Sequence, residues 1–183
     1  MLLGLYSQTM QSGKTTIAKL LERNYNFYVA SFAMPIKAMI FTLLTTDLNY
    51  SNDDAVEMVF GKDKEKMIDA LGVTTRHLMQ TLGTEWGRQS VNQDIWIKIL
   101  NLRLEKYLKT LNIVIDDMRF PNEAAWIKEN GGKIFRVERE GFARKPGSHI
   151  SEGSLDNYEF DGIIYNTMEE EIKKQLDLLI LGV

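Results

Sequence analysis

The pattern of apolar and polar positions predicts five strands, each a short run of apolar, β-branched or aromatic residues between polar or glycine-containing segments. These runs are residues 2–6, 26–32, 111–115, 133–137 and 162–166. Between them and after the last one, apolar residues recur three or four positions apart, which indicates amphipathic helices. Strands that alternate with helices are typical of a parallel sheet, so we expect an α/β protein in which helices cover both faces of a five-stranded, mainly parallel sheet.

The first predicted strand ends in a small polar loop that leads directly into a helix. Residues 7–12 supply the bend, and the helix begins at Gly13-Lys14-Thr15. A helix that begins there directs backbone N–H groups and the positive end of its dipole into the loop, which favours a bound anion. Lys14 would reach the outer phosphates of a nucleoside triphosphate, and the Thr15 hydroxyl would bind the Mg²⁺ that bridges them. The nucleotide-binding residues expected from this phosphate-binding loop (P-loop) are Gln11, Ser12, Gly13, Lys14, Thr15 and Thr16.

The P-loop departs from the usual pattern at one position, because Gln8 stands where the pattern has a glycine five residues before Gly13. Gln8 can make the turn if its φ angle is negative, but a residue with a Cβ does not guarantee the close approach that glycine allows. A plain strand-to-helix turn is the alternative interpretation. The position of the motif, after an apolar run and before an amphipathic helix, favours nucleotide binding.

A second set of candidate residues follows the continuous β-prone run at 111–115, which is typical of a strand buried on both faces. Asp116 and Asp117 come directly after it, where a P-loop protein places a further Mg²⁺ ligand, usually through water. The alternative is that one of them caps the helix that begins near Pro121, and two consecutive aspartates leave room for both roles. Arg119 is expected near the same crevice, where a guanidinium can offset charge on transferred phosphoryl oxygens.

The helix predicted over 74–91 is a candidate for binding a phosphorylated ring. Arg76, Gln80 and Arg88 gather on one side of it, and Trp86 lies close to them in sequence. Two arginines and a glutamine near an indole would suit a flat ring that carries a phosphate. A surface helix with solvated arginines is the alternative.

The loop after the fourth predicted strand is strongly basic. Arg136, Arg139, Arg144 and Lys145 lie within ten residues. A mobile basic loop of this kind would cover the phosphate donor and exclude water during phosphoryl transfer. A solvated charged loop is the alternative interpretation.

Composition excludes several classes of protein. The 183 residues are 44% hydrophobic and 26% charged, ordinary values for a globular chain of one domain. The absence of cysteine excludes disulfides and thiolate metal sites and suits a cytoplasmic protein. A net charge of −3 argues against a protein that coats nucleic acid, and no apolar run is long enough for a membrane span. Neither His77 nor His149 has the spacing of a zinc ligand, although His149 could serve as a hydrogen-bonding or gating residue.

Four further segments are distinctive. They are Phe32-Ala33-Met34-Pro35-Ile36-Lys37, residues 76–88 with Leu82-Gly83-Thr84-Glu85, Asp117-Met118-Arg119-Phe120-Pro121-Asn122-Glu123, and His149-Ile150-Ser151-Glu152. In this order they resemble the deoxynucleoside monophosphate kinases of bacteriophages, and the resemblance covers nearly the whole chain. The middle two segments are its most specific part, since a P-loop is shared by many unrelated enzymes.

This resemblance implies a single P-loop kinase domain with the three-layer P-loop NTPase fold, a helical acceptor-binding region over about 35–108 and a short lid over about 139–155. The implied reaction is transfer of the γ-phosphate of ATP, with Mg²⁺, to a deoxynucleoside 5′-monophosphate, in the host cytoplasm if the chain is phage-encoded. The implied catalytic residues are Lys14, Arg119, Arg139 and Arg144, with Thr15 and Asp116 or Asp117 at the metal. The implied substrate-binding residues are Phe32, Lys37, Arg76, Gln80, Trp86, Arg88 and Trp96.

Three other functions are compatible with parts of the sequence. One is another small-molecule P-loop kinase, acting for example on dephospho-coenzyme A or on a nucleoside. Another is a nucleotide-binding module without catalysis. Gln8 favours it, while the lid arginines and the pair of Arg76 and Arg88 disfavour it, since a mere binder needs no acceptor site. Direct nucleic-acid binding is disfavoured by the acidic net charge. The base of the acceptor and the oligomeric state stay open, and a homodimer is compatible with the sequence.

Overall fold

The computed structural model describes residues 1–9, 12–139, 141 and 153–182, and the chain forms two compact units. One unit consists of Met1–Phe32 and Ile99–Val183 and contains the main sheet; we call it the sheet unit. The other consists of Ala33–Lys98 and is mostly helical; we call it the helical unit. The acceptor-binding region expected over about 35–108 overlaps the helical unit and continues past it through helix α5 (Ile95–Leu104).

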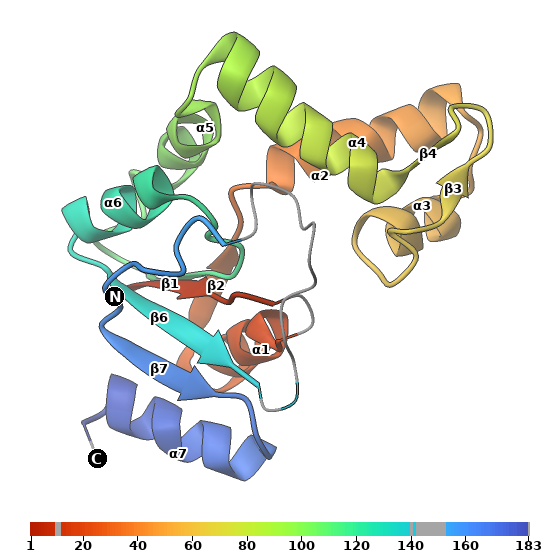
Figure 1. The fold of residues 1–183 in the computed structure, drawn as a ribbon. Coiled ribbons are helices and arrows are strands. Elements are labelled where there is room, and N and C mark those ends of the chain that lie inside the picture. The colour runs from red at the N-terminus through yellow and green to blue at the C-terminus, as the bar shows by residue number, and fades with distance from the viewer. Residues whose placement is uncertain (10–11, 140, 142–152, 183) are drawn as a thin grey trace. The chain divides into compact units, whose positions relative to one another are not determined.

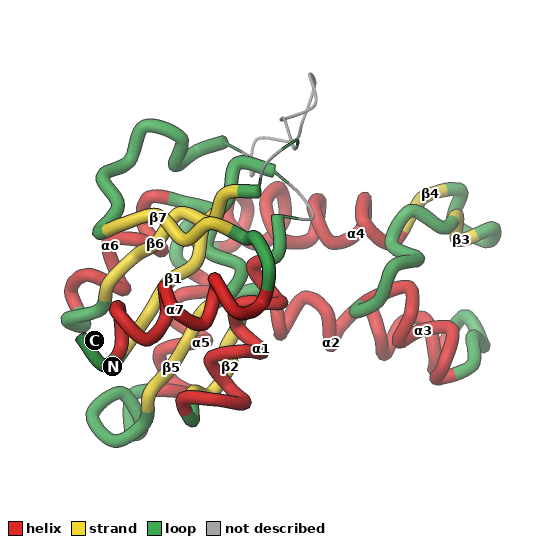
Figure 2. The backbone as a smooth tube through the Cα atoms, turned by 90° about the horizontal axis from the view of Figure 1, so that it is seen from below, coloured by secondary structure: helices red, strands yellow, loops and turns green. Residues whose placement is uncertain are grey.

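Five parallel strands form the main sheet, which confirms the pattern of apolar runs. Their bounds are β1 (Leu2–Tyr6), β2 (Phe27–Ala30), β5 (Asn112–Ile115), β6 (Lys133–Glu138) and β7 (Gly162–Tyr165). Their order across the sheet is β2-β5-β1-β6-β7, which can be followed along the yellow strands of Figure 2. Every neighbouring pair is parallel, so the carboxyl ends of all five strands lie at one edge, where loops from distant parts of the sequence meet.

Helices α1 (Lys14–Tyr25) and α7 (Glu169–Ile180) cover one face of this sheet (Figure 1). Successive side chains of a strand point to opposite faces, so alternate strand residues meet the apolar stripes of the two helices. The resulting core contains Leu3, Leu5, Ile17, Leu20, Leu21, Val114, Phe135, Val137, Ile164, Ile172 and Leu176. Each such side chain contributes about 1.5–3 kcal/mol when fully buried, so this core holds the P-loop helix firmly against the sheet.

Helix α6 (Pro121–Glu129) covers part of the opposite face, and a glycine permits its close approach. A Cβ on Gly4 of β1 would lie 2.6 Å from Cδ1 of Ile127 in α6, so a larger residue would have to displace that side chain. Residues 153–161 cover a neighbouring part of this face, where Phe160 stacks on Tyr6 with ring centroids 5.4 Å apart. Structure on both faces of the sheet confirms the predicted three layers.

The helical unit is built from short elements. They are α2 (Met34–Thr42), the π-helix η1 (Leu43–Asp47), α3 (Asn52–Val59), the antiparallel pair β3 (Met67–Ile68) and β4 (Val73–Thr74), α4 (Thr75–Thr81) and the π-helix η2 (Leu82–Val91). The charge of residues 61–69 predicts a solvated surface segment, and this prediction is wrong at Ile68, which is fully buried. No helix in the described parts of the chain is both long and apolar enough to cross a membrane.

The helix expected over 74–91 is an α-helix only as far as Thr81 and continues as the wider π-helix η2. Trp96 packs against this π-helix. A Cβ on Gly87 would lie 2.4 Å from Cζ2 of Trp96, and Trp96 Nε1 donates a hydrogen bond to Gly83 O at 2.7 Å. The indole of Trp96 therefore packs directly against the backbone of η2, and a larger residue at position 87 would prevent this contact.

Candidate functional site

The loop between β1 and α1 has the geometry of an anion-binding helix N-terminus. Gly13 precedes the first residue of α1 with a φ of +94°, a left-handed conformation that glycine adopts without strain. No acidic residue lies in the first turn of α1, while Lys14 begins the helix and Thr15 and Thr16 are exposed. The first N–H groups of a helix have no acceptor within it, so with the dipole they favour a phosphate here.

Gln8 makes its turn without the positive φ angle that would require glycine. Among the described residues other than glycine, only Asn26 and Asn49 have a positive φ. Ser7 stabilises the bend instead, because its Oγ accepts a hydrogen bond from Thr9 N at 3.1 Å and donates one to Thr9 O at 2.9 Å. The absence of a glycine at position 8 therefore introduces no left-handed strain into the loop.

The two aspartates after β5 have different partners. Thr15 Oγ1 donates a hydrogen bond to Asp116 Oδ2 at 3.1 Å, so this carboxylate lies beside the P-loop. Asp117 is bound to the end of β2: its Oδ2 accepts a hydrogen bond from Ser31 Oγ at 2.7 Å, and its Oδ1 accepts one from Phe32 N at 2.9 Å. The geometry therefore favours Asp116 over Asp117 as the carboxylate that serves a metal at the P-loop.

The donor set at this point suits a metal that arrives with a nucleotide. Mg²⁺ typically takes one or two oxygens from the protein and the rest from phosphates and water, and the Thr15 hydroxyl and Asp116 carboxylate fit that pattern. Within the described residues, no group of three or more His, Cys, Asp or Glu side chains could hold a metal ion. The Thr15 hydroxyl and the Asp116 carboxylate are therefore candidates for part of a Mg²⁺ coordination sphere.

Helix α6 is capped by Glu123, a role that sequence reasoning considered for Asp116 or Asp117. Glu123 is buried, and its Oε2 accepts hydrogen bonds from Arg119 N at 2.6 Å and Phe120 N at 3.0 Å. The signal was present in the sequence, because a glutamate at the third position of a helix commonly reaches back to the preceding N–H groups. The cap also fixes the backbone of Arg119 close behind the two aspartates.

Arg136, the first residue of the basic cluster, is bound into the sheet unit. Its guanidinium lies over the ring of Phe160, 4.9 Å from the ring centroid, and its Nη2 donates to Asp156 O. Tyr6 OH donates to the carboxylate of Asp156 as well. These contacts hold residues 156–160 on the sheet, whereas Arg139, just past β6, is exposed. The predicted residues Gln11, Arg144 and His149 lie outside the described residues.

Arg76 and Arg88 of the helical unit are half-buried, and hydrogen bonds hold both. Arg76 Nε donates to the carboxylate of Glu65, with which it also forms an ion pair, and Arg88 Nη1 donates to Gln93 O at 3.0 Å. Trp86 is 46% exposed, so its indole can be reached from solvent. The exposed indole and the two arginines are compatible with the predicted binding of a phosphorylated ring.

Phe32 and Trp96, both expected to bind substrate, are buried residues. Each is only 3% exposed. Phe32 packs edge-on against Trp126 in the sheet unit, with ring centroids 6.0 Å apart, and Trp96 packs against η2 in the helical unit. Their rings therefore stabilise the two units. Lys37 and Gln80 are half-buried in the helical unit.

A residue that sequence reasoning missed lies at the end of β7. Asn166 Nδ2 donates a hydrogen bond to Ser12 O in the P-loop at 2.8 Å, and Asn166 N donates one to Glu138 O at 2.7 Å. Its position directly after the last strand was the available signal, because the carboxyl ends of parallel strands share one edge.

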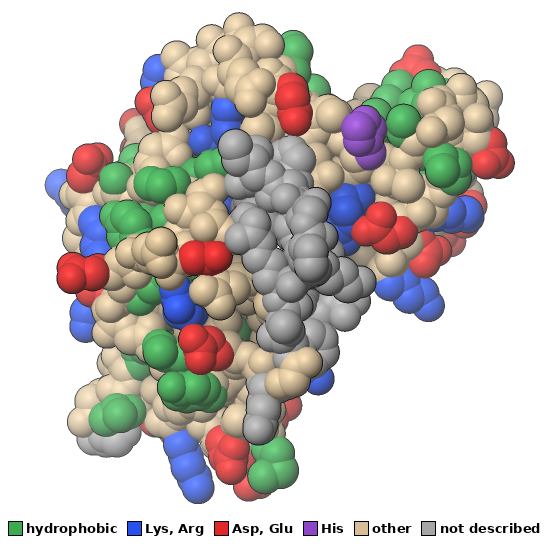
Figure 3. Space-filling view, viewed as in Figure 1, with side chains coloured by type: hydrophobic (Ala, Val, Ile, Leu, Met, Phe, Trp, Pro, Cys, Tyr) green, Lys and Arg blue, Asp and Glu red, His purple; other side chains and the backbone are tan. Residues whose placement is uncertain are grey.

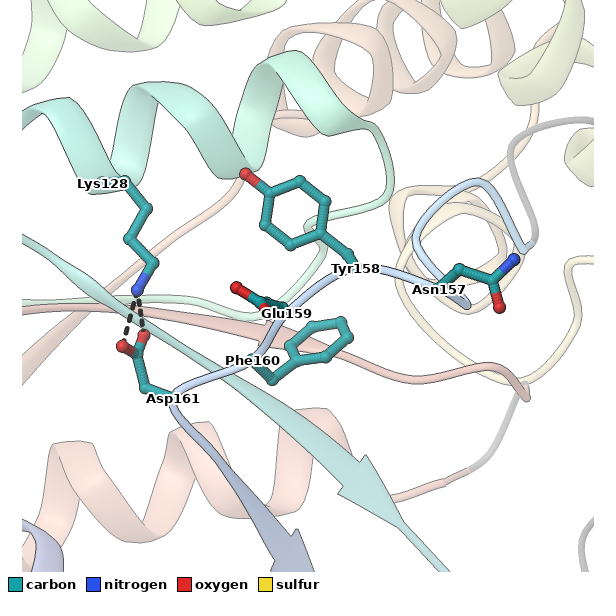
Figure 4. A pocket seen from close by; sticks show the side chains of 6 residues that line it. All are labelled: Lys128, Asn157, Tyr158, Glu159, Phe160 and Asp161. Atoms are coloured by element: carbon teal, nitrogen blue, oxygen red, sulfur yellow. Dashed lines mark hydrogen bonds and ion pairs between the residues drawn. The ribbon is translucent and has the colours of Figure 1, made fainter.

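A surface hollow of about 460 Å³ lies next to α6, and none of the predicted site residues lines it. It is lined by Lys128, Asn157, Tyr158, Glu159, Phe160 and Asp161 (Figure 4). Lys128 Nζ lies 2.5 Å from Asp161 Oδ2, which also accepts a hydrogen bond from Ile134 N at 2.7 Å. Burial raises the pKa of Asp161, but these hydrogen bonds and the charges of Lys128 and Lys133 outweigh burial and bring the pKa below its ordinary value. The ion pair thus fastens the start of β7 to α6.

Charged side chains of both signs are interspersed over the face shown in Figure 3. Among the described residues on that face, Lys and Arg form no continuous stripe.

Comparisons with known proteins identify relatives of this chain. A family model described as deoxynucleotide monophosphate kinase matches residues 49–176. A protein of Acanthamoeba polyphaga mimivirus, provisionally named deoxynucleotide monophosphate kinase, is 30% identical over 176 residues, which cover 87% of this chain and 86% of that protein. The deoxynucleoside-5′-monophosphate kinase of Escherichia phage T5 is 36% identical over 73 residues, 40% of this chain and 29% of that protein.

The fold comparison covers the whole chain. The crystal structure of TT1252 from Thermus thermophilus aligns with 100% of this chain and 97% of its own, with a TM-score of 0.53 at 14% identity, which shows a shared fold. Because the family model matches more than half of the chain and the mimivirus protein aligns with most of it, the chain belongs to the deoxynucleotide monophosphate kinase family and has its P-loop kinase fold.

Proposed function

We propose that this protein transfers the γ-phosphate of ATP to a deoxynucleoside 5′-monophosphate, with Mg²⁺, and releases ADP and the deoxynucleoside diphosphate. The observation that carries the proposal is the P-loop of the sheet unit, where the left-handed Gly13 directly precedes α1 and the Thr15 hydroxyl lies 3.1 Å from Asp116 Oδ2. Family membership supports the class of acceptor.

The donor nucleotide would be held by the first turn of α1. The N–H groups of this turn and Lys14 would bind the β- and γ-phosphates. Lys14 Nζ lies 3.5 Å from Ser12 Oγ, a long hydrogen bond that a phosphate oxygen could replace. When bound, Mg²⁺ would be held by the Thr15 hydroxyl and, through water, by Asp116, and would neutralise charge on the phosphates.

The acceptor needs no general base, because its phosphate is already an anion at neutral pH. The protein therefore acts by positioning the two substrates and offsetting charge. We propose that Arg76 and Arg88 hold the acceptor phosphate, with Lys37, Gln80 and Trp86 beside the nucleoside. The residues proposed to stabilise charge in the transition state are Arg119, Arg139 and Arg144.

Gln8 is the feature that favours a catalytically silent nucleotide-binding module. Gln8 has no positive φ and so makes its turn without left-handed strain. The pair of Arg76 and Arg88 counts against the silent module, since a mere binder needs no acceptor site. We also propose that the protein works in the cytoplasm, where a chain without cysteine is at no disadvantage.

A coupled assay for ADP formation tests the proposal directly. ATP and Mg²⁺ are supplied with each of the four deoxynucleoside monophosphates in turn, and with a nucleoside and dephospho-coenzyme A as rival acceptors. We expect turnover with at least one deoxynucleoside monophosphate and none with the rivals. Absence of turnover, in a protein whose melting temperature ATP still raises, would contradict the proposal and leave only a binding function.

A lysine substitution in the same assay tests the role of the P-loop. Lys14→Ala should abolish turnover with little change in melting temperature, because it removes a charge that contacts the transferred phosphates. Lys19→Ala is the matched control, since Lys19 lies exposed on the same helix, and it should retain full activity. Normal turnover by a folded Lys14→Ala protein would exclude the P-loop from the mechanism.

A further inference from the structure

Asn166 connects the last strand of the sheet to the P-loop, although the two are more than 150 residues apart in sequence. Its backbone N–H donates to Glu138 O at the end of β6, and its side-chain Nδ2 donates to Ser12 O at 2.8 Å. Because the acceptor is a carbonyl oxygen, the nitrogen of the amide must face it. Asn166 is thus fixed at the backbone and holds the loop with its side chain.

The direction of the Ser12 carbonyl determines the direction of the neighbouring N–H. All described peptide bonds are trans, and in a trans peptide the C=O of one residue and the N–H of the next point in opposite directions. Holding Ser12 O towards Asn166 therefore directs Gly13 N–H away from it. It also keeps the partial negative charge of that carbonyl from turning towards a bound phosphate.

The packing around Gly13 supports a close, specific fit. A Cβ on Gly13 would lie 2.1 Å from Nδ2 of Asn166, so the amide occupies the space that any other residue at position 13 would need. Ser12 is 1% exposed, which leaves its carbonyl little access to water as an alternative partner. A buried carbonyl that loses its donor is destabilised in this orientation, and the peptide between Ser12 and Gly13 is then freer to rotate.

We propose that Asn166 is a positioning residue of the phosphate-binding loop, which holds the Ser12–Gly13 peptide with its N–H directed for binding the phosphates of the nucleotide. This inference rests on the proposed function, since it assigns a role within the same nucleotide site. It concerns the phosphate part of the nucleotide and requires no contact between Asn166 and the base.

The test compares a nucleotide with a phosphate-only probe. The dissociation constants of ATP and of inorganic tripolyphosphate, each with Mg²⁺, are measured by calorimetry and by thermal shift for the full chain and its variants. Asn166→Ala should weaken both probes by about tenfold, the size that one hydrogen bond can carry. Asn24→Ala, an exposed asparagine on α1, is the matched control and should change neither.

Steady-state kinetics separate positioning from a general structural role. In Asn166→Ala the KM for ATP should rise, while the KM for the deoxynucleoside monophosphate stays the same. Asn166→Asp, which keeps the shape of the side chain but lacks the donor at neutral pH, should also weaken tripolyphosphate, and it serves if Asn166→Ala does not fold.

Three results would overturn the inference. The first is weaker binding of ATP with unchanged binding of tripolyphosphate, which would show that Asn166 contacts the nucleoside. The second is unchanged binding of both probes by Asn166→Ala, and the third is no binding of either probe by the unmodified protein. If the unmodified protein binds tripolyphosphate but phosphorylates no deoxynucleoside monophosphate, the proposed function fails while the binding comparison still decides the role of Asn166.

Discussion

Replacing each of the two consecutive aspartates by alanine should separate catalysis from stability. Asp117 accepts hydrogen bonds from Ser31 Oγ and Phe32 N, and hydrogen bonds to a charged group contribute about 1.5–3 kcal/mol each. Partial exposure of Asp117 reduces this, so we expect Asp117→Ala to lower the free energy of unfolding by about 2–3 kcal/mol. For a chain of this length each kcal/mol shifts the melting temperature by about 2–4 °C, which predicts a fall of roughly 4–12 °C.

Asp116→Ala should have the opposite effect, with little loss of stability and a large loss of turnover. Its hydrogen bond from Thr15 is exposed, so we expect a loss of at most about 1 kcal/mol in stability. Turnover should nevertheless fall by about 100-fold or more and require a higher concentration of Mg²⁺, because a group that orients the metal is lost. Calorimetric melting and a Mg²⁺ titration of the coupled assay measure the two effects. The assignment would be refuted if Asp117→Ala needed more Mg²⁺ than Asp116→Ala, or if Asp116→Ala were the less stable protein.

Three further outcomes follow from the structure. Gln8→Gly should not tighten ATP binding, because Gln8 already makes its turn without a positive φ. It should lower the free energy of unfolding by about 0.4–1 kcal/mol, because glycine adds freedom to the unfolded chain. Tighter ATP binding in a titration would contradict the first expectation. The pKa of Asp161 is lowered in the folded protein, so its contribution is present above about pH 4 and is lost as the pH falls through the folded-state pKa. The free energy of unfolding, measured in urea between pH 2 and 6, should therefore depend less on pH for Lys128→Ala than for the unmodified protein. Equal pH dependence of the two proteins would exclude the ion pair with Lys128 as the cause of the lowered pKa. Burial and the hydrogen bond to Asp177 raise the pKa of Tyr25 to about 12. The contribution of Tyr25 to the free energy of unfolding is therefore complete below about pH 10 and is lost as the pH rises through 12. The stability difference between the unmodified protein and Tyr25→Phe should shrink over that range, and a constant difference would refute the assignment.

The five strands could be predicted because each is an apolar run whose burial does not depend on distant details. The π-helix at the end of the helix over 74–91 could not be predicted, because the hydrophobic pattern predicts a helix without distinguishing its type; in the structure the indole of Trp96 packs against this segment. The burial of Ile68 was also beyond prediction, since the surrounding charges dominate the local pattern.

The candidate site also contains residues that the sequence could indicate and residues that only the fold distinguishes. Lys14 and Thr15 could be identified from sequence because the motif, the strand before it and the helix after it are contiguous. Asp116 and Asp117 are chemically identical and adjacent, so only their partners in the fold distinguish them. Asn166 carries no motif at all, and its link to Ser12 exists only because β6, β7 and β1 end at the same edge of the sheet.

The amino-acid sequence by itself determined the class of fold, the order of its strands and helices, and a phosphate-binding loop at the start of the first helix. It could do so because hydrophobic periodicity and helix-terminus chemistry are local properties. The tertiary structure decided which aspartate accepts a hydrogen bond from Thr15, that Gln8 introduces no left-handed strain, that Glu123 caps α6, and that Phe32 and Trp96 are buried. Those outcomes depend on hydrogen bonds and contacts between residues far apart in the chain, which become adjacent only when the strands pair.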